Sequence, residues 1–170
     1  MGPSLFMGRG KPQWLLLLLA GAFGVPASAQ HSNGYVFVAP GGATCCGRTT
    51  ATIHAGVGGE AVLTKGIGVG AEIGPLAELQ IFDSSVIGLF SINGYYHFNR
   101  DSDSKWDPFV TGGYSNAFRS GHISLGNFGV GTNYWFVRHF GLRAEFRDHV
   151  HHGDGATLQY WGFRFGLAFH

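Results

Sequence analysis

Apolar and polar residues alternate along much of this chain, and the alternation is clearest in its last eleven residues, 160–170. One face of an extended strand there carries only large apolar side chains, those of Trp161, Phe163, Phe165, Leu167 and Phe169. The opposite face carries glycine, other small or polar residues, and the charged Arg164. A membrane β-barrel has this arrangement, with an apolar outside and a polar inside, so the segment predicts one of its strands.

The same alternation recurs in segment after segment and predicts about eight strands, because no long stretch after the N-terminal segment keeps a helical period. The predicted strands are 35–40, 52–63, 67–74, 86–98, 107–118, 123–137, 140–149 and 158–169. Most are close to the roughly 9 to 11 residues that a tilted strand needs to cross a bilayer. The pattern therefore favours an all-β fold, an antiparallel up-and-down transmembrane β-barrel of about eight strands.

The predicted connections alternate between short and long. Tight or moderate turns are expected at 64–66, 99–106 and 138–139, and longer links at 41–51, 75–85, 119–122 and 150–157. Up-and-down membrane barrels have short periplasmic turns and longer extracellular loops. We therefore interpret the short-turn side as periplasmic.

Charged residues keep to the polar face of the strands that can be assigned. A Lys or Arg that faces lipid at the bilayer centre costs about 2–4 kcal/mol, which explains this avoidance. The strand around 109–114 does not assign to either register. The six charges predicted to form a lumen network are Glu60, Glu72, Arg143, Glu145, Arg147 and Arg164.

These six charges sum to zero, as a narrow interior requires, because an unpaired buried ion costs several kcal/mol. A barrel of about eight strands is just wide enough for side chains to fill it. The sequence therefore predicts a filled lumen and no open pore. Aromatic residues at the short-turn side predict an interfacial girdle, formed by Tyr96, Phe98, Trp106, Tyr134, Phe136 and Phe140.

The N-terminus predicts export. Arg9 and Lys11 precede an apolar run from Trp14 to Phe23, and small residues at 27–29 form a cleavage pattern. The run is shorter than the roughly 20 residues of a transmembrane helix, which disfavours an anchor. We therefore expect a cleaved signal peptide at 1–29 and one barrel domain at 30–170.

The net charge and the glycine content of the chain exclude some classes of partner and structure. Without Arg9 and Lys11, the 11 basic residues become 9 against 10 acidic ones, a net charge of −1, which argues against nucleic acid binding. The 29 glycines are interleaved with large apolar residues, so disorder is a poor explanation of their number.

The exported chain, its period-2 segments, the motif GLRAEFR at 141–147 and the closing RFGLAF at 164–169 together resemble small outer-membrane β-barrel proteins of Gram-negative bacteria. The resemblance is to the OmpA transmembrane domain and OmpX-like type. It implies location in the outer membrane, contact with its lipids, and recognition of the C-terminal strand by the barrel-assembly machinery. Members typically end on an aromatic residue, whereas here His170 follows Phe169.

Candidate chemistry concentrates in two places. Asp148, Asp154 and three histidines cluster near the last long link, and the histidines are weak candidates for metal ligands: His149, His151 and His152. His149 and His151 share a strand face, as metal ligands can, but no third ligand at fixed spacing is identifiable. A solvated loop is therefore the preferred interpretation, and no cofactor is expected. Cys45 and Cys46 are adjacent, which leaves free thiols, a vicinal disulfide and intermolecular links open.

Three functions are compatible with these features. The preferred one is a structural or surface-interaction barrel without enzymatic activity, whose surface ligand the sequence does not specify. The second is an enzyme that modifies outer-membrane lipid, similar to lipid A deacylases, although their H-x-S-N pattern is replaced by His149-Val150-His151-His152. The third is a secreted soluble barrel that holds a ligand, which would need a polar exterior and an apolar cavity.

Overall fold

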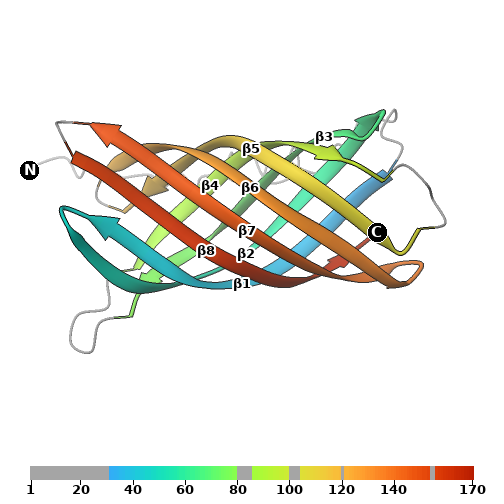
Figure 1. The fold of residues 1–170 in the computed structure, drawn as a ribbon, viewed down its shortest axis with the longest axis horizontal. Helices are drawn as coiled ribbons and strands as arrows, with labels where there is room; N and C mark the ends of the chain where they lie inside the picture. The colour runs from blue at the N-terminus through green and yellow to red at the C-terminus, as the bar shows by residue number, and fades with distance from the viewer. Residues whose placement is uncertain (1–30, 80–85, 100–103, 120, 154–155) are drawn as a thin grey trace, which may run out of the picture.

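A computed structural model of the chain describes residues 31–79, 86–99, 104–119, 121–153 and 156–170, and these form a closed antiparallel barrel of eight strands in sequence order (Figure 1). The predicted fold class is confirmed. The strands are β1 (His31–Cys45), β2 (Arg48–Thr64), β3 (Ile67–Glu78), β4 (Val86–His97), β5 (Trp106–Phe118), β6 (His122–Val137), β7 (Phe140–Gly153) and β8 (Ala156–Phe169). The predicted signal peptide at 1–29 lies outside the described residues. Among the described residues, no helix is long and apolar enough to cross a bilayer.

The strands are staggered around the barrel. Starting at Phe169 of β8 and passing from partner to partner through all the strands leads back to β8 at Gln159, ten residues along the strand. A barrel closes only with such a shift, which tilts its strands by roughly 35–45° to the axis. The tilt is visible in Figure 1.

The two ends of the barrel are defined by its turns. The end that carries the C-terminus and the turns at 65–66 and 138–139 is called the inner end, and the end that carries the turn at 46–47 the outer end. The two inner-end turns lie where the sequence predicts them. The links predicted at 41–51, 75–85 and 150–157 are shorter than expected, because β1, β2, β3, β7 and β8 continue into them.

The strand ends that the sequence assigns to links do not alternate between apolar and polar residues, but their backbones pair with the neighbouring strands. Residues 41–45 are small or polar and pair in register with residues 48–52 of β2. Backbone hydrogen bonds extend a strand whatever its side chains, whereas alternation between apolar and polar residues reports only the part that separates lipid from lumen. The strands therefore continue beyond their apolar segments.

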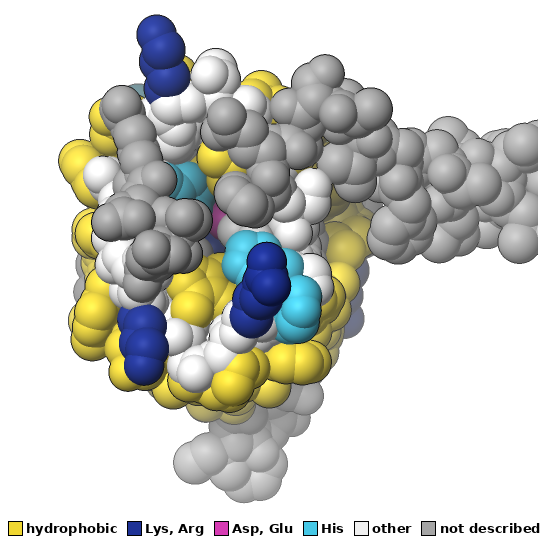
Figure 2. Space-filling model, turned by 90° about the vertical axis from the view of Figure 1, so that its right-hand side faces the viewer, with side chains coloured by type: hydrophobic (Ala, Val, Ile, Leu, Met, Phe, Trp, Pro, Cys, Tyr) yellow, Lys and Arg dark blue, Asp and Glu magenta, His cyan; other side chains and the backbone are white. Residues whose placement is uncertain are grey.

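The outer wall is apolar and the interior polar, which inverts the arrangement of a soluble protein. Val57, Val130 and Phe165 are more than half exposed on the wall, whereas Glu72, Asn133 and other polar side chains are buried. Figure 2 shows the inner end face on, with hydrophobic side chains around the wall and lysine, arginine and histidine side chains at the end itself. The predicted aromatic girdle lies at this end, where Trp106 and Tyr134 pack with ring centroids 4.8 Å apart.

The structure resolves the register of β5. Phe109, Thr111 and Ser115 face the interior, whereas Val110 and Tyr114 face outward. The alternation is obscured because the inner face carries a large aromatic residue and the outer face carries polar Asn116.

Candidate functional site

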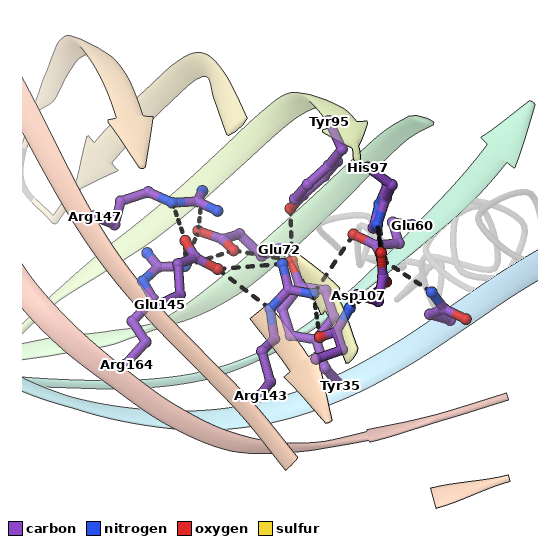
Figure 3. A network of polar contacts seen from close by, with 12 residues as sticks. Tyr35, Glu60, Glu72, Tyr95, His97, Asp107, Arg143, Glu145, Arg147 and Arg164 are labelled. Carbon is purple, nitrogen blue, oxygen red and sulfur yellow. Dashed lines mark hydrogen bonds and ion pairs between the residues drawn. The ribbon is translucent and has the colours of Figure 1, made fainter. Parts of the chain in front are cut away.

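The interior of the barrel holds all six charged residues that the sequence places there, and each is at most 4% exposed. They lie on four strands: Glu60 on β2, Glu72 on β3, Arg143, Glu145 and Arg147 on β7, and Arg164 on β8. Alternate positions of a strand share a face, so β7 contributes an Arg-Glu-Arg row to one side of the lumen. Figure 3 shows the groups converging from opposite walls.

Glu72 is the most heavily bonded carboxylate of this network. Arg164 Nη1 donates to both of its oxygens at 2.8 Å, and Arg147 Nη1 donates to Oε1 at 3.3 Å. The Tyr35 hydroxyl donates to Oε2 at 3.0 Å. Charge-assisted bonds of this number offset the cost of removing the carboxylate and both guanidinium groups from water.

Glu145 connects the two halves of the network. It accepts hydrogen bonds from Arg147 Nε and, at 3.2 Å, from Arg143 Nε, and Arg164 Nη1 lies 3.8 Å from its Oε1. Arg143 Nη1 in turn lies 3.6 Å from Oε2 of Glu60. The six residues therefore form one connected set of ion pairs across the lumen.

Two members of the network were missed by the charge count from sequence. His97 Nδ1 lies 2.9 Å from Asp107 Oδ1, and its Nε2 lies 3.6 Å from Glu60 Oε1. Asn133 Nδ2 also donates to Asp107, at 3.0 Å. With Asp107 included, the network holds four carboxylates and three arginines, so the expected three-to-three balance is incomplete. Protonation of His97, whose ring nitrogens face two of these carboxylates, would supply a fourth positive charge.

Aromatic side chains pack around the arginines and fill the space between them. The Arg143 guanidinium carbon lies 4.3 Å from the ring centroid of Tyr35 and 4.2 Å from that of Phe109. The corresponding distance from Arg164 to Phe37 is 4.5 Å. Such contacts favour a desolvated cation by about 2 kcal/mol.

An apolar layer lies toward the outer end of the lumen. Its buried members come from five strands: Leu76, Leu89, Ala117, Leu125 and Tyr160. Between it and the arginines, Asn127 Nδ2 donates to Asn93 at 2.9 Å and to Ser115 at 2.8 Å. The interior is therefore filled by an ionic network, an amide and hydroxyl layer, and an apolar layer.

The structure does not gather the three candidate metal ligands around one point. His149 is buried in the lumen and stacks on Tyr160 at a centroid distance of 5.1 Å. His151 Nδ1 lies 2.7 Å from the Ser124 carbonyl oxygen, and His152 Nδ1 lies 3.0 Å from Thr157 Oγ1. Within the described ranges, no group of three His, Cys, Asp or Glu side chains could hold a metal ion.

Asp148 is an exception to the expectation that charged residues of the strands face the lumen. The sequence groups it with the histidines near the last long link, but it lies within β7 on the outer face, two residues from Phe146. It is only 5% exposed, opposite Trp161 in the register, and accepts a hydrogen bond from Gln159 Nε2 at 2.7 Å. Its neighbours therefore cover a carboxylate that would otherwise face the surroundings of the barrel.

A closed barrel with an apolar wall and a charged, filled interior defines the class of small eight-stranded transmembrane β-barrels. The sequence matches no protein-family model and no curated protein. Among solved structures, the chain is similar to the N-terminal barrel domain of OprF from Pseudomonas aeruginosa, with a TM-score of 0.57 and 17% identity over 82% of this chain and 98% of that one.

Two further similar structures belong to the same class. Neisserial surface protein A has a TM-score of 0.62 and 10% identity, over 81% of this chain and 96% of that one. Ail, the attachment invasion locus protein of Yersinia pestis, has a TM-score of 0.54 and 12% identity, over 81% of this chain and 97% of that one. At these identities the likeness concerns the fold, and it confirms the predicted resemblance to small outer-membrane barrels at that level.

Proposed function

We propose that the chain is an outer-membrane barrel protein with a structural or surface-interaction role, and that its lumen is not an open pore. The observation that carries the proposal is the filled interior, where charged residues from β2, β3, β7 and β8 join across the lumen and an apolar layer follows them. The proposed role is not enzymatic and needs no cofactor.

Three features support placement in the outer membrane. The N-terminal segment has the pattern of an export signal. The wall exposes large apolar side chains from all eight strands, which suits lipid and not water. The similar structures are barrels of this kind from Gram-negative bacteria. In this proposal the inner end faces the periplasm and the outer end faces the cell surface.

The first prediction concerns conductance. Because the ionic network and the apolar layer block the path in succession, the purified barrel in a planar lipid bilayer should give no stable conductance step at voltages where a general porin, as positive control, conducts. Single-channel recording measures this. Large, uniform and long-lived steps from the purified protein would contradict the filled lumen.

In this proposal, the outer ends of the strands make the contacts with partners at the cell surface. The β1–β2 hairpin ends in small and polar residues, with the hydroxyl groups of Thr44 and Thr49 3.0 Å apart across the strands. Such residues suit water or a partner and not lipid. Among the similar structures, Ail is named for attachment and invasion, which supports a surface role for this fold without indicating a ligand for this chain.

The proposed partners during biogenesis are membrane lipid and the barrel-assembly machinery, which would recognise β8. Phe169 lies at the end of that strand, where its ring covers Gly34 of β1, and the pairing of β8 with β1 closes the barrel. Replacing it should disturb both recognition and closure.

The second prediction follows from this contact. Phe169→Ala should lower the amount of folded barrel in the outer membrane several-fold, measured as the heat-modifiable fraction on gels. Phe163→Ala, on the same face of β8 but away from its end, is the matched control and should have the smaller effect. Equal losses in the two variants would argue against a special role for the terminal aromatic residue.

A further inference from the structure

Both cysteines of the chain lie at the outer end of the barrel, Cys45 as the last residue of β1 and Cys46 in the turn that joins β1 to β2. This turn has two residues, Cys46 and Gly47, with φ angles of +55° and +76°. Two-residue hairpins favour such left-handed turns, because their twist matches that of the strands. Cys46 therefore adopts a conformation that costs a residue with a side chain about 1–2 kcal/mol.

This turn brings the two thiols together. Neighbouring residues of a regular strand point to opposite faces, so adjacent cysteines in a strand would be separated. The left-handed conformation of Cys46 reverses that relation, and the two Sγ atoms lie 2.9 Å apart as free thiols. Cys46 is exposed and Cys45 half-buried, so a solute can reach the pair. No other cysteine exists in the chain to compete for either thiol.

The residues around the two thiols determine which sulfur-binding ligands the pair can hold. The segment 43–50 contains no histidine or carboxylate, and within the part of the chain that the structure describes no group of three His, Cys, Asp or Glu could hold a metal ion such as structural zinc. Arg48 pairs with Cys45 in the register and adds a positive charge, which disfavours a metal cation. The hydrogen bond with Cys46 raises the pKa of the Cys45 thiol, which keeps it protonated at neutral pH.

A neutral ligand that reacts with two protonated thiols fits these conditions. We propose that Cys45 and Cys46 form a surface dithiol site for trivalent arsenic in the form of its neutral oxyacid or a monosubstituted arsenical. Arsenous acid, As(OH)₃, reacts with two thiols to form two As–S bonds. Two As–O bonds and two S–H bonds break, and two water molecules leave. No electron is transferred, and the net charge does not change.

The test uses the full barrel in detergent, reduced with a phosphine, and phenylarsine oxide as the probe. Intact mass should increase by one phenylarsine oxide less one water, because one phenylarsenic group replaces the two thiol hydrogens. Ethanedithiol should reverse the adduct where an equal concentration of a monothiol does not. Cys45→Ser and Cys46→Ser should each weaken capture about 100-fold or more, because the second bond forms within the molecule. Single-cysteine variants that bind as tightly as the wild type would overturn the proposal.

A matched turn elsewhere in the barrel provides a second test. Lys65 and Gly66 join β2 to β3 with φ angles of +51° and +81°, almost the same geometry without thiols. In a chain with both native cysteines replaced by serine, Thr64→Cys together with Lys65→Cys should restore capture. Failure of that folded variant, checked by heat-modifiable migration, would contradict the inference that the turn creates the site. If the reduced wild-type barrel does not bind phenylarsine oxide, the proposed dithiol site is contradicted.

Discussion

Replacing Glu72 by glutamine should lower the free energy of unfolding by about 3–5 kcal/mol, the cost of breaking a buried ion pair by removing one partner. The Glu72 carboxylate accepts from Arg164 at 2.8 Å and from Arg147 at 3.3 Å, and all three side chains are at most 3% exposed. The glutamine side chain keeps the volume but not the charge. Arg164 would retain only Glu145, at 3.8 Å, as a carboxylate partner.

Urea unfolding in detergent micelles or thin lipid bilayers, followed by tryptophan fluorescence, measures this loss. Glu78→Gln is the matched control, because Glu78 is the last residue of the same strand and only half-buried. It should change the free energy of unfolding by no more than about 0.5 kcal/mol. If the two substitutions cost the same, the network does not stabilise the barrel in the way described.

Placing an arginine on the outer wall should have the second large effect. Val57 lies near the middle of β2, faces outward and is 53% exposed. Val57→Arg should lower the free energy of unfolding in a bilayer by about 2–4 kcal/mol, because the charge would face the hydrocarbon region.

The control for this substitution lies on the same strand. Thr49→Arg places the same charge on an exposed residue next to the outer turn, where it meets water, and should leave stability within about 0.5 kcal/mol of the wild type. Repeating both measurements in lipid vesicles separates the effect of lipid from that of detergent. A penalty of similar size at both positions would contradict the assignment of the wall to lipid.

The sequence predicts the barrel and its lumen charges because one physical rule governs both. The cost of exposing charge to lipid sorts residues by face, and in β7 the row Arg143, Glu145 and Arg147 is legible directly from the alternation. This cost does not apply where a strand extends beyond the hydrocarbon region, so the residues there are not sorted by face. The paired ends of β1 and β2 were therefore interpreted as loops, although their backbones continue the sheet.

The residues that sequence reasoning missed are those whose role depends on contacts between strands. Asp107 joins the network through His97 of β4 and Asn133 of β6, its neighbours in the barrel. Nothing local to β5 indicates this, because the faces of that strand do not separate by polarity. Asp148 shows the converse, since a charge on the outer face is tolerated where it is buried and accepts a hydrogen bond from Gln159.

The central claim is that this chain folds as a barrel whose outside is apolar and whose inside is charged and filled. Detergent phase partitioning of the purified folded chain, read on unheated and heated gels, tests it most directly. The account predicts a heat-modifiable species that partitions into the detergent phase, because the exposed valine, isoleucine, leucine and phenylalanine side chains of the wall require an apolar environment. A folded, heat-modifiable species that stays in the aqueous phase without detergent would contradict it.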